Sequence, residues 1–172
     1  MSMTDEVSMF LHSSIVRSLG LIENASPKQF NAASLDLINA DDIILFYPND
    51  QVVKKKFDEN INNIIVEAGT LVLIHSKEIV NIPRNMCGWL SLRSTAARSW
   101  INHSSALLIQ PGFSGTIAFE FYFYKDTVLN RGESFMQLAI SRLELPVDES
   151  DADEYVSRYR GIGHLEGIKN NA

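Results

Sequence analysis

The segment from Thr116 to Tyr124, TIAFEFYFY, constrains the fold most, because its apolar side chains alternate strictly. Successive side chains of a β-strand point to opposite faces, so this alternation predicts a strand with one buried face. The side chains predicted to face the core are Ile117, Phe119, Phe121 and Phe123. The opposite face carries Glu120 among small and aromatic neighbours, where a carboxyl group is costly to bury unless it is paired, hydrogen-bonded or protonated. Simple solvent exposure of that face is the alternative.

Shorter apolar runs separated by turn residues follow Pro27 along the chain. The runs predicted to be strands are 34–38, 43–47, 64–66, 71–75, 87–92 and 135–143. Many short strands with little helix predict a mainly β fold, a β-barrel or sandwich of jelly-roll type. Before them, the spacing of Val7, Leu11, Ile15 and Leu19 predicts a short N-terminal amphipathic helix, with Thr4 as its cap and Gly20 at its end.

A chain of 172 residues can be served by one hydrophobic core, so we expect a single domain over residues 1–172. Within it, residues 1–145 are predicted to form the helix and the β core. Composition changes at Pro146, where an acidic stretch precedes a segment with glycines and aromatic residues. Residues 146–172 are therefore predicted to be a C-terminal lid.

Composition disfavours several classes of protein. Acidic residues outnumber basic residues 21 to 15, and the longest basic run is Lys54–Lys56, so no nucleic-acid partner is expected. No apolar run reaches the ~18 residues of a membrane span, and the N-terminus does not resemble a secretory signal. Cys87 is the single cysteine, which excludes a disulfide framework and a thiolate zinc site. We expect Cys87 to be buried and the protein to be cytoplasmic.

Two further segments contain candidate site residues. In LRSTAARSW, Ser94 or Thr95 can cap a short helix, and Arg93 and Arg98 add forked donors for an anion. A capped surface helix with solvated arginines is the alternative. The segment Gln110 to Gly115 predicts a tight loop, which is most often only a hairpin.

His103, in contrast, is predicted to be a structural hydrogen-bonding residue, because a single histidine is seldom a catalyst.

Taken in order, the segments QFNAASLDL, EAGTLVLIHSKEIVNIPRNMCGWLSLRSTAARSW, INHSSALLIQPGFSGTIAFEFY and RGESFMQLAI resemble a known family. From about Gln29 to Leu143 the chain is similar to the dCTP deaminase branch of the trimeric dUTPase-like superfamily. The resemblance rests on an R-S-S/T-x-A-R segment, a P-G-F/W-x-G loop and a glutamate on the following strand. It implies a distorted jelly-roll β-barrel of the dUTPase-like type, assembled as a homotrimer with active sites between subunits.

The resemblance also assigns roles to individual residues. Glu120 is implied to be the general acid/base, with Ser94 and Arg98 as the other catalytic residues. The residues implied to bind the nucleotide are Arg93, Ser94, Thr95, Ala96, Ala97, Arg98, Ala106, Gln110, Ala118, Phe119 and Glu120, with Arg158 and Tyr159 in the lid. Mg²⁺ is implied to be carried by the triphosphate, with no zinc and no protein metal site.

The implied activity is the hydrolytic deamination of dCTP to dUTP and ammonia in pyrimidine deoxynucleotide metabolism. Gln110 stands where the family usually has an aspartate, and a neutral amide is a poor base. We therefore expect a monofunctional dCTP deaminase. The alternatives are a bifunctional enzyme that releases dUMP and pyrophosphate, and a non-catalytic nucleotide-binding trimer that regulates nucleotide pools.

Overall fold

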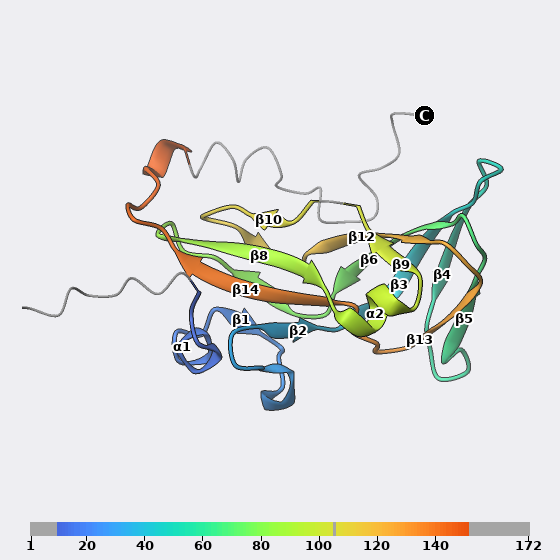
Figure 1. Cartoon of the computed structure of the whole chain (residues 1–172), viewed down its shortest axis with the longest axis horizontal. Helices are drawn as coiled ribbons and strands as arrows, with labels where there is room; N and C mark the ends of the chain where they lie inside the picture. Colours follow the sequence, from blue (N-terminus) through green and yellow to red (C-terminus); the bar gives the residue numbers. More distant parts are fainter. Residues whose placement is uncertain (1–9, 105, 152–172) are drawn as a thin grey trace, which may run out of the picture.

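The computed structural model describes residues 10–104 and 106–151, which form a mainly β fold with two short α-helices (Figure 1). The elements in chain order are α1 (Ser13–Ser18), β1 (Ile22–Glu23), the 3-10 helix η1 (Pro27–Gln29), β2 (Leu35–Leu37), β3 (Asn39–Phe46), β4 (Val52–Lys56), β5 (Asn63–Val66), β6 (Leu71–Ser76), β7 (Ile79–Asn81), β8 (Met86–Leu92), α2 (Ser94–Arg98), β9 (Ile101–His103), β10 (Leu108–Ile109), β11 (Ser114–Gly115), β12 (Ala118–Phe123), β13 (Thr127–Asn130) and β14 (Met136–Arg142).

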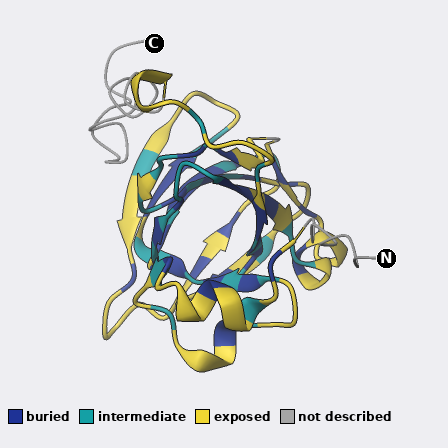
Figure 2. Cartoon of the chain, turned by 90° about the vertical axis from the view of Figure 1, so that its left-hand side faces the viewer, coloured by how far each residue is buried: buried dark blue, intermediate teal, exposed yellow. Residues whose placement is uncertain are grey.

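The strands are arranged in four antiparallel sheets. The largest has the order β4-β3-β6-β12-β9, and the next has the order β10-β8-β14-β2. Smaller sheets, β1-β7-β11 and β13-β5, complete the arrangement. Viewed end-on, the strands form a ring, and many residues along them are buried (Figure 2). This jelly-roll-like arrangement confirms the fold class predicted from the sequence.

Strand β12 confirms the prediction made from alternation. Phe119 and Phe123 are 0% exposed and Phe121 is 1% exposed, so the phenylalanine face lies in the core. The strand pairs with β6 on one side and with β9 on the other, and it therefore lies inside the five-stranded sheet. The alternate residues of β12, including Glu120, are placed on the opposite face of that sheet.

The N-terminal helix differs from the prediction in its extent and in its buried face. It begins at Ser13, with His12 as its N-cap, whereas the expected cap, Thr4, lies outside the described residues. Ile15 and Leu19 are 40% and 48% exposed, and Val16 is the helical residue that packs into the core. Leu11 lies before the helix, where its backbone N–H donates to the Ile140 carbonyl, and a periodic pattern cannot show this contact.

Cys87 is buried, as expected, and its Sγ lies 3.1 Å from the hydroxyl oxygen of Ser141.

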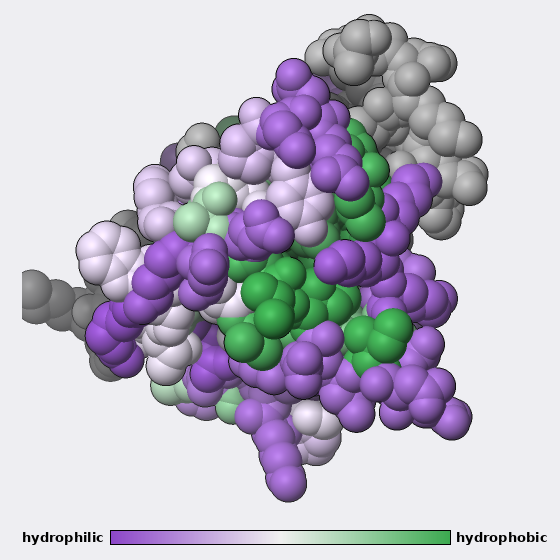
Figure 3. All heavy atoms as spheres, turned by 90° about the vertical axis from the view of Figure 1, so that its right-hand side faces the viewer, coloured by the Kyte–Doolittle hydropathy of each residue, from purple (hydrophilic) through white to green (hydrophobic). Residues whose placement is uncertain are grey.

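A hydrophobic patch lies on the surface at the end of the molecule where β4, β5 and β13 lie (Figure 3). Its exposed apolar residues include Ile65 and Val128, which are register partners in β5 and β13. Within the described residues, no helix is long and apolar enough to cross a membrane.

Glu78 is a buried carboxyl group that no sequence pattern indicates. One of its oxygens accepts a hydrogen bond from Gln29 Nε2 at 2.7 Å and the other accepts from the Ile38 amide at 3.0 Å. Desolvation nevertheless raises the pKa of Glu78, against the opposing effects of these hydrogen bonds and of nearby Lys77. The Glu78 carboxyl group thus links η1 to the residue between β2 and β3. Its burial makes the ionised form energetically costly.

This cost predicts a pH-dependent contribution to stability. A pKa raised in the folded state gives a stabilising contribution that is complete below the unfolded-state pKa and is lost as pH rises through the folded-state pKa. The advantage of the parent over Glu78→Gln in unfolding free energy should therefore shrink as pH rises above the ordinary value of 4.5. Urea titrations over a pH series measure it, with exposed Glu67→Gln as the control. An advantage that grew with pH would contradict the prediction.

Candidate active site

Glu120 lies in the middle of β12, opposite Leu73 of β6. Its backbone carbonyl accepts a hydrogen bond from the Ser104 amide at 2.9 Å, which fixes the strand beside the end of β9. The Glu120 side chain is 33% exposed, so one part of the carboxyl group is accessible from outside the sheet. Its Oε2 atom is buried and has no hydrogen-bond partner in the described structure.

His103, the last residue of β9, is a titratable neighbour of that carboxyl group. Its Nε2 lies 3.7 Å from Glu120 Oε2, too far for a hydrogen bond, and its side chain is only 2% exposed. The ring packs edge-on against Phe121 at a centroid distance of 5.7 Å. Desolvation lowers the pKa of His103 and raises the pKa of Glu120, so both shifts favour the neutral forms. Because its pKa is raised, the Glu120 carboxyl group takes up a proton more easily than an exposed glutamate does.

The sequence predicts a structural, hydrogen-bonding role for His103 and gives no sign that it lies beside Glu120. Both of its ring nitrogens are buried without a hydrogen-bond partner in the described structure, so the expected structural hydrogen bond is not present. The pairing of β9 with β12 places His103 opposite Phe121, one residue from Glu120. Because β9 is only three residues long, the sequence pattern gave little signal of this pairing.

Helix α2 carries the second group of candidate residues. The N-cap residue is Arg93, and Ser94 is the first helical residue, which corrects the prediction that Ser94 or Thr95 caps the helix. The guanidinium group of Arg93 forms an ion pair with Asp36, at 3.1 Å, and donates to the Ser134 carbonyl. Arg93 therefore connects the start of α2 to β2 and to the segment before β14.

The other residues of α2 differ in exposure. Ala96 is 3% exposed and packs into the core, whereas Ser94, Thr95, Ala97 and Arg98 are exposed. Among the described residues, no hydrogen bond or ion pair joins Ser94 or Arg98 to Glu120. Within the described chain, therefore, the exposed Ser94 hydroxyl and Arg98 guanidinium of α2 are not joined to the Glu120 carboxyl group of β12.

The expected tight loop is present between β10 and β11. The Phe113 amide donates to the Gln110 carbonyl at 3.2 Å, and Gly112 has φ +84°, which is the geometry of a turn with proline second and glycine third. The Gln110 side chain is half-buried at the start of this turn. Ala106 is exposed, and its amide donates to the Ser104 carbonyl at 2.6 Å.

The remaining predicted site residues fall into two groups. On β12, Ala118 is half-buried, whereas the Phe119 side chain lies wholly in the core, so Phe119 can offer only its backbone to a ligand. Arg158 and Tyr159 of the predicted lid lie outside the described residues.

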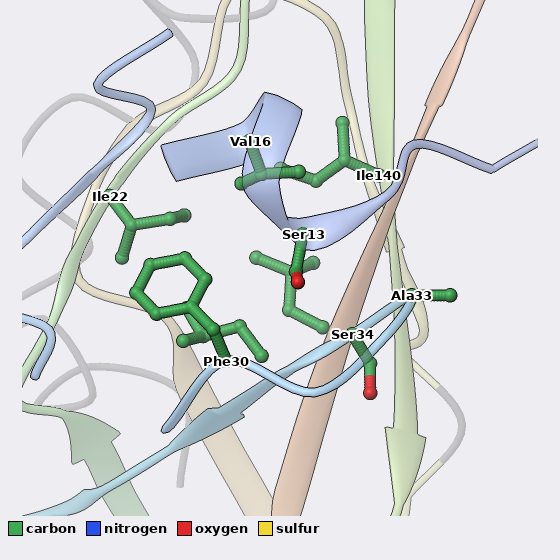
Figure 4. Close-up of a pocket in the computed structure, with 9 residues that line it drawn as sticks. Ser13, Val16, Ile22, Phe30, Ala33, Ser34 and Ile140 are labelled. Atoms are coloured by element: carbon green, nitrogen blue, oxygen red, sulfur yellow. The ribbon is translucent and has the colours of Figure 1, made fainter. Parts of the chain in front are cut away.

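A small apolar pocket beneath α1 is lined by Val16, Phe30, Ile140 and their neighbours (Figure 4). None of the candidate site residues lines this pocket. No cluster of three or more histidine, cysteine, aspartate or glutamate residues suited to a metal ion occurs within residues 10–104 and 106–151.

Comparison with known protein families shows which family the chain belongs to. The family model described as dCTP deaminase-like matches residues 9–143, which include β12 and α2. The chain belongs to the dCTP deaminase-like family. Glu120, Ser94 and Arg98 all lie within the matched residues.

Individual members of the family are similar over part of their length. The chain is 35% identical over 102 residues to a dCTP deaminase of Photorhabdus laumondii, a match that covers 59% of this chain and 46% of that protein. It is 33% identical over 106 residues to a dCTP deaminase of Haemophilus influenzae, covering 61% and 48%. The chain thus spans about half the length of the curated relatives it matches.

A solved structure supports the same fold. The crystal structure of a 2'-deoxycytidine 5'-triphosphate deaminase from Agrobacterium tumefaciens superimposes with a TM-score of 0.68 at 15% identity. The superposition covers 89% of this chain and 54% of that one.

Proposed function

We propose that this chain is a dCTP deaminase, which converts dCTP and water to dUTP and ammonia. The observation that carries the proposal is Glu120, a partly exposed carboxyl group whose pKa is raised by burial, on a strand within the region matched to the dCTP deaminase-like family. A general acid/base works best when its pKa lies near the working pH, so the raised pKa suits a carboxyl group that must accept and return protons.

The reaction moves two protons, and one carboxyl group can take up and return each of them in sequence. Glu120, as carboxylate, takes a proton from water while the water oxygen bonds to C4 of cytosine. The protonated carboxyl group then gives that proton to the ring nitrogen next to C4. Glu120 next takes the proton of the new hydroxyl group and gives it to the amino group, and the C4–N bond breaks to release ammonia. Atoms and protons balance, with uracil and ammonia as products.

The residues of α2 supply the complementary groups in this proposal. Ser94 can hold the attacking water through its hydroxyl, and Arg98, an exposed cation, can stabilise negative charge at the nucleotide. Arg93 positions α2 through its contacts with Asp36 and Ser134. In this proposal the substrate is the nucleotide with Mg²⁺ on its triphosphate, as the resemblance to the family implies.

The separation of the α2 residues from Glu120 supports a shared site. Because no contact joins Ser94 or Arg98 to Glu120 within the described chain, we propose a homotrimer in which each site combines groups of neighbouring subunits. Ala106 and Gln110 would contact the base and sugar, and Arg158 and Tyr159 would close over the nucleotide. Light scattering tests the assembly, and a monomer at micromolar concentration would contradict it.

Gln110 distinguishes deamination alone from deamination followed by hydrolysis. Attack on the phosphate chain needs a base near it, and the amide of Gln110 cannot accept a proton at neutral pH. We therefore expect dUTP to accumulate from dCTP with little release of pyrophosphate. Chromatography of the nucleotides, together with a pyrophosphate assay, measures this.

The controls separate the remaining alternatives. Gln110→Asp should leave deamination nearly unchanged, since Glu120 serves the base end of the nucleotide. Stoichiometric pyrophosphate from dUTP with the parent protein would favour the bifunctional enzyme. Binding of dCTP without any turnover would favour the non-catalytic regulatory trimer.

A further inference from the structure

Three buried polar atoms without hydrogen-bond partners lie together at the Glu120 carboxyl group. They are Glu120 Oε2 and both ring nitrogens of His103, within the described structure. Buried polar atoms are normally hydrogen-bonded, and leaving them unpaired lowers stability. Glu120 is also the one charged group within ion-pair distance of His103 in the described part of the chain.

The packing around His103 does not by itself require a histidine. Its ring meets the rings of Phe119 and Phe121 edge-on, at centroid distances of 6.3 Å and 5.7 Å, and its side chain is 2% exposed. A leucine, which is apolar and of similar volume, would fill this space without burying two polar nitrogens. Packing therefore favours an apolar residue here, and the imidazole is better explained by a contact with Glu120.

The surroundings of the ring indicate which of its nitrogens carries the proton. Desolvation lowers the pKa of His103, so at neutral pH the ring is neutral and has one N–H group and one acceptor nitrogen. A proton on Nε2 faces Glu120 Oε2, an acceptor 3.7 Å away. A proton on Nδ1 has no acceptor in the described structure. The tautomer with Nε2–H is therefore the favoured one.

The two oxygens of the Glu120 carboxyl group differ in access. Oε2 is buried while the side chain is 33% exposed, so Oε1 is the oxygen that a substrate can reach. A hydrogen bond from His103 to Oε2 would leave Oε1 to accept and return protons. Because Oε2 can accept this bond whether the carboxyl group is ionised or protonated at Oε1, the contact can persist through the reaction.

We propose that His103 is a positioning residue, whose Nε2–H donates to Glu120 Oε2 and so directs each proton transfer of the reaction to Oε1. The two atoms must approach by roughly 0.8 Å, from 3.7 Å to the usual ~2.9 Å of such a bond. Hydrogen bonds of this kind are often long in an unliganded site and shorten when substrate binds. The proposal rests on the deamination proposed above and adds the residue that orients its acid/base.

The first test separates positioning from packing. His103→Leu should lower kcat for dCTP by ~10- to 100-fold, because an acid/base that is not held in place loses rate, while KM changes little. The free energy of unfolding, measured in urea titrations, should equal or exceed that of the parent, because the leucine buries no polar atoms. A kcat within a few-fold of the parent would overturn the proposal. A loss of kcat explained by a loss of folded protein would also overturn it.

The second test asks which nitrogen is used. The amide nitrogen of glutamine is as many bonds from Cβ as His103 Nε2 is, whereas the amide nitrogen of asparagine reaches only as far as Nδ1. His103→Gln should therefore restore most of kcat, and His103→Asn should be as slow as His103→Leu. His12→Gln makes the same change at the exposed N-cap of α1 and should retain the parent rate. Equal rates for the glutamine and asparagine variants of His103 would refute the proposal.

A third measurement does not depend on turnover. The sequence holds four histidines, and the nitrogen NMR signals of His103 are those that His103→Gln lacks. They should show Nε2 protonated and Nδ1 unprotonated, and the Nε2 signal should shift in Glu120→Gln. A proton on Nδ1 would overturn the proposal even in a protein that deaminates dCTP. The expected signals in a parent that does not convert dCTP would instead contradict the proposed reaction and support the His103–Glu120 contact.

Discussion

Replacement of Glu120 by glutamine is expected to lower the deamination rate by at least ~10²-fold, while the affinity for dCTP changes little. Glutamine keeps the size and a hydrogen-bonding oxygen, but it cannot accept and return a proton. In the proposed site the negative charge of the nucleotide rests on other residues, such as Arg98 of α2, so its binding should depend little on Glu120. Ammonia release measures the rate, and isothermal titration with dCTP measures the affinity.

Glu67→Gln makes the same chemical change at an exposed turn and should retain the parent rate. Activity of Glu120→Gln within a few-fold of the parent would show that another group moves the protons. A loss of affinity as large as the loss of rate would assign Glu120 to substrate binding.

Replacement of Phe119 by alanine is expected to lower the free energy of unfolding by ~3–5 kcal/mol. Its side chain is 0% exposed, with its ring 5.7 Å from that of Phe121 and 6.3 Å from that of His103. Truncation leaves a cavity within the five-stranded sheet that its neighbours cannot fill without moving. The cost should be measured in urea titrations of the folded protein.

Val128→Ala is the control, because Val128 is 51% exposed and a surface truncation changes stability by only about 0.5 kcal/mol. Phe119→Leu preserves most of the volume and should restore much of the stability together with deamination. A stable Phe119→Ala variant with a weakened affinity for dCTP would instead place the phenyl ring in the nucleotide site.

Strand β12 was predictable because a single physical rule decides it. A strand with one face in the core requires period-two alternation, and the four apolar residues of TIAFEFYFY satisfy that rule without information from elsewhere. Strand β4 shows the reverse case. It lies at the edge of the five-stranded sheet, where Lys54, Lys55 and Lys56 are exposed, so it carries no apolar alternation to detect. Lysines at such an edge discourage pairing with other chains.

The sequence alone determined the buried face of β12 and the tight turn at Gln110 to Phe113. Both depend on local preferences of neighbouring residues, which are present in the chain before it folds. The proposal of Glu120 as the acid/base rests in addition on the resemblance to the family. The tertiary structure decided that His103 lies beside Glu120, that Arg93 pairs with Asp36 and that Trp100 is exposed with a left-handed backbone. These contacts join residues whose proximity depends on strand pairing and burial, and no local pattern encodes that pairing.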